Sequence, residues 1–107
     1  MSLLQPEEFG IDCMDMNGGR TIYVRGELGP MTAPLLGRTI ANVEYDVERL
    51  VIDVSDVTYL CGAGVQVFLL GFYQMIGRGS EFIVRGAAGT VRDQLEAAGL
   101  EDCLAFL

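Results

Sequence analysis

A strand followed within a few residues by an uncharged helix, in residues 50–77, constrains the fold of this chain more than any other feature. The strand is an apolar, largely β-branched run at residues 50–54 that only Asp53 interrupts, which is typical of a strand covered on both faces. Residues 55–58 are expected to end it, and beyond the next loop the apolar residues recur with helical spacing. The predicted apolar stripe consists of Val65, Phe68, Leu69, Phe72 and Ile76.

The first turn of this predicted helix, Gly62-Ala63-Gly64, carries almost no side-chain atoms. The first backbone N–H groups of a helix have no partner within it and lie at the positive end of its dipole. A bare first turn therefore leaves these groups accessible. Gly77 and Gly79 provide C-cap chemistry at the other end. We expect function to reside at the corner where the strand passes into the helix.

Local patterns place the remaining elements on either side of this unit. Asn17-Gly18-Gly19, between two alternating segments, predicts a β-hairpin because these residues tolerate positive φ. Thr32 is the expected N-cap of the next helix, and Pro34 suits its first turn. That helix has an expected apolar face of Leu35, Leu36, Ile40 and Val43. The expected strands are residues 9–16, 20–28, 49–54, 81–85 and 103–107, and the expected helices are residues 33–43, 62–76 and 91–98.

The element order β-β-α-β-α-β-α-β predicts an α/β fold. Strands separated by single helices are joined by right-handed crossovers, which gives a mixed sheet with a parallel part. We expect residues 1–8 to form a flexible arm and residues 9–107 to form a single domain. With the helices packed on one face of the sheet, the other face needs cover from elsewhere, and a homodimer contact is one source of it.

Charge and composition exclude several classes of function. The 107-residue chain has a net charge of −8 and a pI of about 4.2, which argues against nucleic acid or a membrane surface as partner. Its seven basic residues are all arginine, which is typical of GC-rich bacteria, and it contains no histidine. His-dependent triads and His-based metal sites are therefore excluded, and we expect neither enzymatic activity nor a cofactor. Without a membrane span or a signal peptide, the predicted location is cytoplasmic.

Three segments, in this order and at these spacings, make the chain resemble a known family. Gly26-Glu27-Leu28 followed by Thr32-Ala33-Pro34 is similar to the family's G-E-L-D-x-x-T-A-P segment between second strand and first helix. Residues 50–57 are similar to its third strand, with the family's aspartate at Asp53, and residues 91–100 are similar to its third helix. On these motifs the chain resembles the anti-sigma factor antagonists of the STAS domain fold over nearly its whole length.

The resemblance implies a STAS-like mixed sheet and a protein-binding role in partner switching. In this family an anti-sigma factor, which is also a GHKL-type Ser/Thr kinase, captures the unphosphorylated antagonist and releases its sigma factor. The kinase then phosphorylates a serine in the family's D-S-S-G motif, and the antagonist dissociates. A phosphate adds about two negative charges, which is enough to disrupt a fitted interface.

The chain departs from the family pattern at the phosphorylation site. With Gly64 aligned to the glycine of the motif, Cys61 replaces its aspartate, Gly62 its phosphoserine and Ala63 its second serine. Gly29 likewise replaces the aspartate of the G-E-L-D segment. Because no hydroxyl group remains in this loop, we predict a docking surface that phosphorylation at the usual position does not switch.

The expected partner-binding residues lie in the loop before the first predicted helix and on the outward side of the second. They are Gly29, Pro30, Met31, Thr32, Cys61, Gly62, Ala63, Gly64, Val65, Gln66, Leu70 and Tyr73. Simpler interpretations remain open, because the glycines also permit a tight turn and single surface apolar residues are common. The chain could also serve as a non-phosphorylatable scaffold subunit of a signalling assembly.

Two other hypotheses concern the same corner. A cysteine directly before a helix N-terminus, Cys61, is favoured as a thiolate, and with Cys103 or Cys13 as resolving thiol it would make a redox sensor. Cys61 is otherwise a small buried residue. The bare helix N-terminus could instead hold a nucleotide phosphate or another anion, although the chain has no P-loop lysine.

Overall fold

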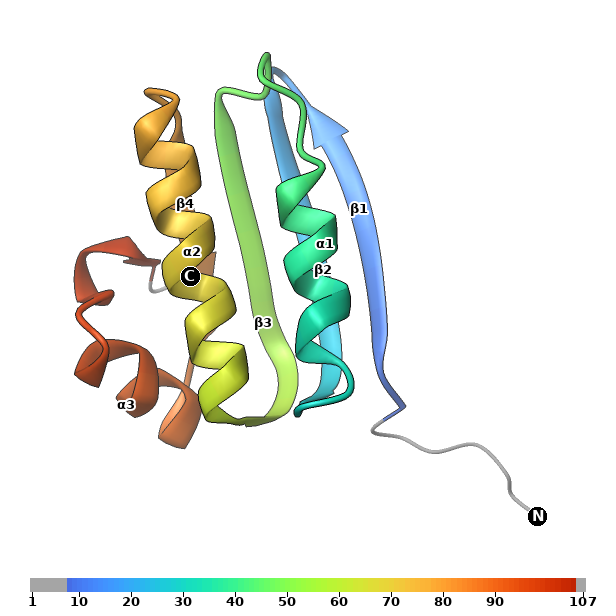
Figure 1. The fold of residues 1–107 in the computed structure, drawn as a ribbon, viewed down its shortest axis with the longest axis vertical. Coiled ribbons are helices and arrows are strands. Elements are labelled where there is room, and N and C mark those ends of the chain that lie inside the picture. The colour runs from blue at the N-terminus through green and yellow to red at the C-terminus, as the bar shows by residue number, and fades with distance from the viewer. Residues whose placement is uncertain (1–7, 106–107) are drawn as a thin grey trace.

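The computed structural model describes residues 8–105, which form a five-stranded mixed sheet with three α-helices (Figure 1). The strands lie in the order β1-β2-β3-β4-β5; β1 runs antiparallel to β2, and the other neighbours are parallel. The elements are β1 (Gly10–Met16), β2 (Gly19–Leu28), α1 (Ala33–Ala41), β3 (Arg49–Leu60), α2 (Gly62–Gly77), β4 (Glu81–Arg85), α3 (Gly89–Ala97), the 3-10 helix η1 (Glu101–Cys103) and β5 (Leu104–Ala105). The predicted fold class and element order are confirmed, and of the predicted arm only residue 8 lies within the described residues.

The hairpin between β1 and β2 closes through Asn17 and Gly18, whose φ angles are 52° and 82°. Two successive positive φ angles are typical of the short turns that match the twist of paired strands. This turn places Cys13 opposite Ile22, and alternation along β2 then directs Ile22 and Val24 into the core. The predicted hairpin is confirmed.

The strand β3 continues to Leu60, so the predicted end of this strand at Val54 is wrong. Parallel pairing with β2 reaches Leu28 opposite Leu60, and two register shifts accommodate the polar segment after Val54. At the start of that segment, Ser55 donates hydrogen bonds from its backbone N–H and its hydroxyl group to Asp53 Oδ1, at 3.0 and 2.5 Å. Pairing with a neighbouring strand therefore outweighs the local polar composition.

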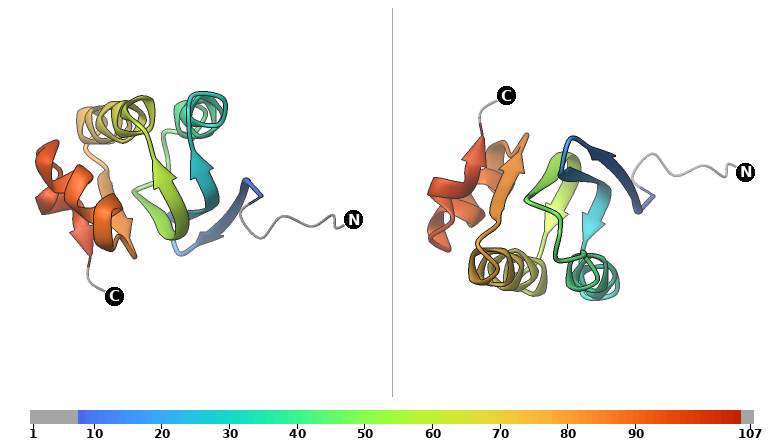
Figure 2. Two further views of the ribbon diagram at one scale, coloured as in Figure 1. Left: turned by 90° about the horizontal axis from the view of Figure 1, so that it is seen from below. Right: turned by 90° about the horizontal axis from the view of Figure 1, so that it is seen from above.

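Helices cover only one face of the sheet, so the expectation that β3 is covered on both faces is also wrong. Leu50, Ile52 and Val54 are buried, whereas Val51 and Asp53 between them are partly exposed. The helices α1 and α2 lie side by side over the buried face, and α3 lies beyond α2 on the β4 side (Figures 1 and 2). We call the opposite side of the sheet, over which no described helix lies, the open face.

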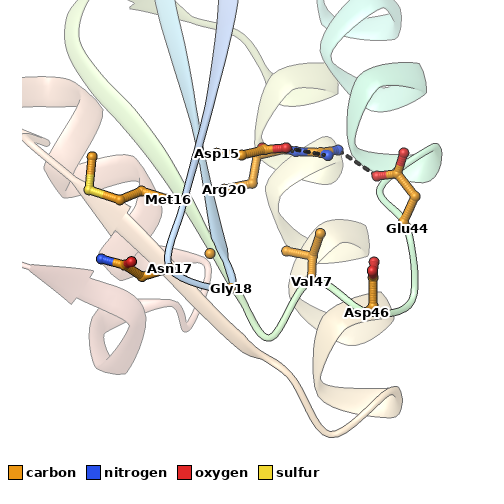
Figure 3. A pocket seen from close by; sticks show the side chains of 9 residues that line it. Asp15, Met16, Asn17, Gly18, Arg20, Glu44, Asp46 and Val47 are labelled. Carbon is orange, nitrogen blue, oxygen red and sulfur yellow. Dashed lines mark hydrogen bonds and ion pairs between the residues drawn. The ribbon is translucent and has the colours of Figure 1, made fainter.

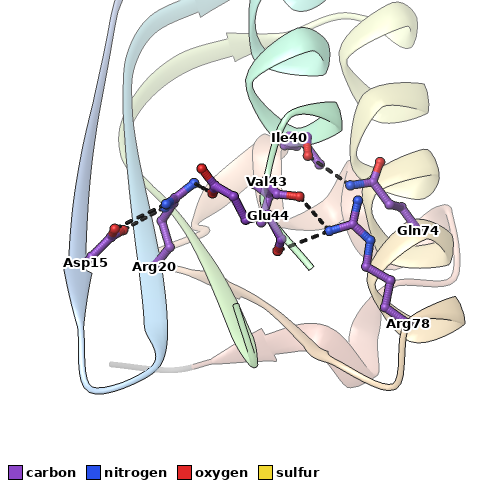
Figure 4. Close-up of polar contacts among 7 residues, drawn as sticks. All are labelled: Asp15, Arg20, Ile40, Val43, Glu44, Gln74 and Arg78. Atoms are coloured by element: carbon purple, nitrogen blue, oxygen red, sulfur yellow. Dashed lines mark hydrogen bonds and ion pairs between the residues drawn. The ribbon is translucent and has the colours of Figure 1, made fainter. Parts of the chain in front are cut away.

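Side chains of α2 and of its C-cap residue bind carbonyl groups at and just beyond the C-terminal end of α1 (Figure 4). Gln74 Nε2 donates to the carbonyl oxygen of Ile40 at 2.9 Å, and Arg78 Nη1 donates to that of Val43 at 2.6 Å. The Arg78 guanidinium also lies 3.9 Å from the centre of the Tyr45 ring. These contacts fix the end of α2 beside the end of α1.

The predicted apolar stripe of α2 is confirmed in part, because Phe68 is buried and Val65, Leu69 and Phe72 pack against the core. The fully buried residues of this helix are Gly64, Phe68, Gly71 and Met75. A β-carbon on Gly71 would lie 3.1 Å from Phe82 and 3.3 Å from Ile40, so this glycine lets α2 approach both β4 and α1 closely. The helix is therefore rotated relative to the prediction, and Ile76, predicted for the core, is exposed. Leu35, predicted for the apolar face of α1, is exposed as well.

Candidate functional site

The carboxyl ends of the parallel strands β2 and β3 bring the two predicted docking segments together, at the lower end of the molecule in Figure 1. The backbone N–H of Cys61 donates a hydrogen bond to the carbonyl oxygen of Leu28 at 2.9 Å. The loop at residues 29–32 therefore starts beside the strand-to-helix corner at residues 61–64. In open α/β sheets, loops at this edge commonly form binding sites.

The loop at residues 29–32 is held in shape by the Thr32 hydroxyl group. This group donates a hydrogen bond to the carbonyl oxygen of Glu27 at 2.6 Å and accepts one from the backbone N–H of Gly29 at 2.9 Å. Thr32 occupies the predicted N-cap position of α1, but its side chain makes no capping hydrogen bond to the helix. Its hydroxyl group instead closes the loop, which presents Met31 to solvent with 86% of its surface exposed.

The first turn of α2 is open to solvent, as the sequence predicts. Cys61 is the N-cap residue with extended backbone angles, and no side chain caps the turn. Gly62 and Ala63 are exposed, and the turn contains no acidic residue. The backbone N–H groups at the positive end of the helix are thus covered by no side-chain cap. The hypothesis of an anion at this turn stays a prediction.

The glycines of this corner are present for different reasons. A β-carbon on Gly64 would lie 2.5 Å from Leu60 Cδ1, so the tight-turn interpretation holds for Gly64. A β-carbon on Gly62 or Gly29 would have no neighbour within 4 Å, and neither residue has a positive φ angle. Larger residues would therefore fit at Gly62 and Gly29. Packing explains Gly64 and leaves the absence of a side chain at Gly62 unexplained.

The outward side of α2 carries exposed apolar residues along most of its length. Leu70 and Tyr73 are each 65% exposed, and Gln66 is also at the surface. Val65, predicted for the same surface, is half-buried and packs against the core. The sequence analysis missed Ile76, which extends this side of the helix because the true buried stripe is rotated away from it.

Tyr59 is a second surface residue that the sequence analysis missed. It is 52% exposed and lies two residues before Cys61, at the end of β3. Its outward direction follows from alternation with the buried Leu60, a signal that becomes readable only when β3 is extended to its true end.

The three thiols are too far apart for a disulfide bond. Cys13 lies on β1, and Cys103 directly precedes β5, so four strand spacings, about 19 Å, separate them. Along the strands, Cys13 is level with Ile22 and Cys61 with Leu28, roughly 20 Å further on. Pairing through Ile52 and Val84 also places Leu104, the neighbour of Cys103, level with Ile22, so Cys61 lies about as far from Cys103. Burial also raises the pKa of the Cys13 and Cys103 thiols. The predicted resolving role of these two residues is therefore wrong, because a disulfide needs α-carbons within about 7 Å.

A hollow of about 460 Å³ lies at the opposite end of the molecule, beside the hairpin turn (Figure 3). The Arg20 guanidinium is held there between Asp15 and Glu44, at 2.6 and 2.8 Å. The hydrogen bond from Arg20 lowers the pKa of the Asp15 carboxyl group. Because two carboxylates already engage this arginine, an anionic ligand would have to displace one of them. We therefore place the candidate site at the other end.

The described residues, 8–105, contain no group of three His, Cys, Asp or Glu side chains that could hold a metal ion. No helix in the same range is long and apolar enough to cross a lipid bilayer.

Comparisons with known proteins agree with the fold. A family model described as "Mlab, STAS domain" matches residues 15–107. An anti-sigma factor antagonist from Mycobacterium paratuberculosis is 30% identical, with a TM-score of 0.79 over 95% of this chain and 87% of that chain. The unphosphorylated form of the anti-sigma factor antagonist SpoIIAA is 15% identical, with a TM-score of 0.80 over 90% of this chain and 86% of that chain. The phosphorylated form of SpoIIAA, a Bacillus cell fate determinant, is 16% identical, with a TM-score of 0.75 over 92% of this chain and 89% of that chain. A search of the curated proteins gives no match.

Proposed function

Because the chain belongs to the STAS domain family and is of the anti-sigma factor antagonist type, we propose that it docks an anti-sigma factor or a related GHKL-type Ser/Thr kinase. The contact surface consists of the loop at residues 29–32, the first turn of α2 and the outward side of that helix. The observation that carries the proposal is the absence of charge along α2. None of its 16 residues is charged, although the chain has a net charge of −8.

Exposed apolar side chains on this surface support a protein partner. Met31, Leu70 and Tyr73 are exposed on a helix and loop that otherwise present small or uncharged residues. A partner that covers them gains about 25 cal/mol for each Å² of apolar surface removed from water. The Tyr73 ring lies in an edge-to-face contact with Phe72, 5.4 Å between centroids, and tyrosine is common at the centre of protein interfaces.

The lack of a phosphate acceptor supports constitutive binding. The resemblance aligns Gly62 with the phosphoserine of the family, and Cys61, Ala63 and Gly64 provide no hydroxyl group either. SpoIIAA has both an unphosphorylated and a phosphorylated form. In the present chain no phosphate can add its roughly two negative charges at this turn, so we propose that the surface stays competent to bind.

Titration calorimetry with the purified GHKL-type kinase of the same organism, with and without Mg-ATP, tests this function. We expect the same affinity under both conditions. Gly62→Asp places a carboxylate at the proposed contact and should weaken binding by about tenfold or more. The positive end of the helix dipole stabilises a carboxylate at this position, so we expect the fold to be retained. Gly62→Ala is the matched control, since its β-carbon meets nothing within 4 Å.

Gly62→Ser tests the mechanism from the other direction. This variant restores a hydroxyl group at the aligned position, in a space that is open in the structure. We expect it to bind the kinase without ATP and to be released when ATP is added. Equal binding of Gly62→Asp and the native chain would contradict the docking surface. Phosphate on Thr58 of the native chain, with release by ATP, would contradict constitutive binding.

A second candidate function is that of a scaffold subunit in a larger signalling assembly. The missing hydroxyl group favours it, because a permanent subunit needs no release step. The same variants distinguish the two functions. A scaffold subunit would not bind the isolated kinase. Its Gly62→Asp variant would be lost from a sensor-containing complex, whereas its Gly62→Ala variant would still join that complex.

A further inference from the structure

The open face carries an apolar row that crosses four strands. The strand register places Met14 opposite Thr21, Thr21 opposite Val51, and Val51 opposite Ile83. Directly opposed residues project from the same side of a sheet, so these four side chains form one continuous row perpendicular to the strands. Met14 is 52% exposed, and the other three are partly exposed. The row is therefore accessible apolar surface.

Paired charges flank this row at equal distances on both sides. Two residues before Val51, Arg49 on β3 forms an ion pair with Glu81 on β4, at 2.7 Å. Two residues after Val51, Asp53 on β3 forms an ion pair with Arg85 on β4, at 2.9 Å. The order of the signs is reversed between the two pairs. On β3 the arginine precedes the row and the acid follows it, whereas on β4 the acid precedes the row and the arginine follows it.

We propose that the open face binds a second copy of this chain, in a two-fold dimer whose axis runs along the row of Met14, Thr21, Val51 and Ile83. A rotation of 180° about that axis lays the row of one copy on the row of the other. It also exchanges what lies before the row with what lies after it. Arg49 then faces the partner's Asp53, and Glu81 faces the partner's Arg85. Both contacts join opposite charges, so the face is complementary to itself.

Internal pairing lowers the cost of covering this face. A charge that is buried without a partner is expensive, whereas these four charged groups already form two ion pairs within one chain. Ser55 also donates to Asp53, and Arg85 Nη2 lies 3.4 Å from the Tyr23 hydroxyl group. The four groups carry two positive and two negative charges, which sum to zero. Their neutrality contrasts with the charge of −8 on the whole chain.

The charge distribution favours a second copy on this face over an approach through the acidic parts of the chain. Since the four groups contribute nothing to the net charge, the excess of −8 lies elsewhere on the chain, and copies that approach through those regions repel each other.

Such a dimer leaves both docking surfaces free. The helices α1 and α2 lie on the side of the sheet away from the open face (Figure 2). The two copies of α2 would therefore lie on opposite outer sides of the dimer, and each could bind a partner. This proposal goes beyond the proposed function and does not depend on it.

Sedimentation equilibrium of the full chain, from low to high micromolar concentration, tests the dimer. We expect a reversible monomer–dimer equilibrium across this range. Val51→Glu places two carboxylates at the axis and should abolish the dimer. Met14→Glu, at an exposed position where misfolding is not expected, should weaken it strongly. The matched control Leu70→Glu places the same charge on α2 and should leave the dimer intact.

Crosslinking tests the direction of the axis. In a Cys13→Ser, Cys61→Ser background, Thr21→Cys should crosslink to itself through a bis-maleimide reagent that spans about 10 Å. Leu70→Cys in the same background should not. A chain that stays monomeric at every concentration would overturn the proposal. So would a dimer that survives Val51→Glu but is lost in Leu70→Glu, or a dimer in which Thr21→Cys fails to crosslink.

Discussion

Gly64 lies so close to Leu60 that a β-carbon at position 64 would be 2.5 Å from Leu60 Cδ1. Leu60 is buried, and the carbonyl oxygen of Leu28 would lie 3.3 Å from the same atom, so neither neighbour has room to move away. Gly62, two residues earlier in the same turn, has no such neighbour. One glycine is thus required by packing, and the other leaves a surface open.

Gly64→Ala should therefore destabilise the chain, whereas Gly62→Ala should not. Forcing one extra carbon into a packed corner typically lowers the free energy of unfolding by about 1–3 kcal/mol. At Gly62 the same change fills open space and favours the helix, so stability should stay within about 1 kcal/mol or rise. Urea denaturation followed by circular dichroism measures both. Equal losses in the two variants would show that the close contact is not limiting.

Thr32→Val should loosen the loop that carries Met31. The substitution keeps the shape but removes the hydroxyl group that bonds to Glu27 and Gly29. We expect a loss of about 1–2 kcal/mol in the free energy of unfolding. Thr39→Val is the control, because the Thr39 hydroxyl bonds only to Leu35 on the exposed side of α1. A similar loss in both variants would argue against a specific role for Thr32.

Stability should fall in acid partly through Asp53. Burial opposes ionisation of this carboxyl group, but hydrogen bonds from Ser55 and Arg85 outweigh it, and its pKa is lowered. A lowered folded-state pKa stabilises the fold above the unfolded-state pKa of about 4, and this contribution is lost as the pH falls through the folded-state value. Urea denaturation between neutral pH and pH of about 3 measures the slope.

Asp53→Asn isolates this contribution from those of other acids. Asp15 and Glu44 also have lowered pKa values, so the native chain loses stability in acid for several reasons. The difference in unfolding free energy between the native chain and Asp53→Asn should shrink as the pH falls below about 4. A difference that is independent of pH would mean that the Asp53 carboxylate contributes no linked stability.

Arg78→Leu should release the end of α1 from α2. It removes the hydrogen bond to the carbonyl oxygen of Val43 and the contact over the Tyr45 ring. We expect a loss of about 1–3 kcal/mol, since a carbonyl group loses a charged donor. Hydrogen exchange should quicken at the C-terminal end of α1. Arg38→Leu on the exposed side of α1 should leave both readouts nearly unchanged.

Local signals in the sequence predicted the elements and much of the candidate site. Asn17 and Gly18 fixed the hairpin, because tolerance of positive φ belongs to those residues themselves. The outward positions of Leu70 and Tyr73 followed from helical spacing alone. The resemblance of three short motifs predicted the fold class, since their order along the chain reflects a single topology.

Contacts between distant residues decided the rest. The true end of β3 at Leu60 depends on pairing with Leu28, and local composition near Ser55 predicted the opposite. The different roles of Gly62 and Gly64 likewise depend on where the side chain of Leu60 lies.

The sequence by itself determined which segments form strands and helices, and that an uncharged helix starts with a first turn that has no hydroxyl group. Only the tertiary structure decided which glycine is held by packing, that the thiols lie far apart, and that Met14, Thr21, Val51 and Ile83 form one row. The physical reason is that propensity and periodicity act between near neighbours in the chain. Register and close packing are set instead by hydrogen bonds and contacts between strands that the sequence keeps far apart.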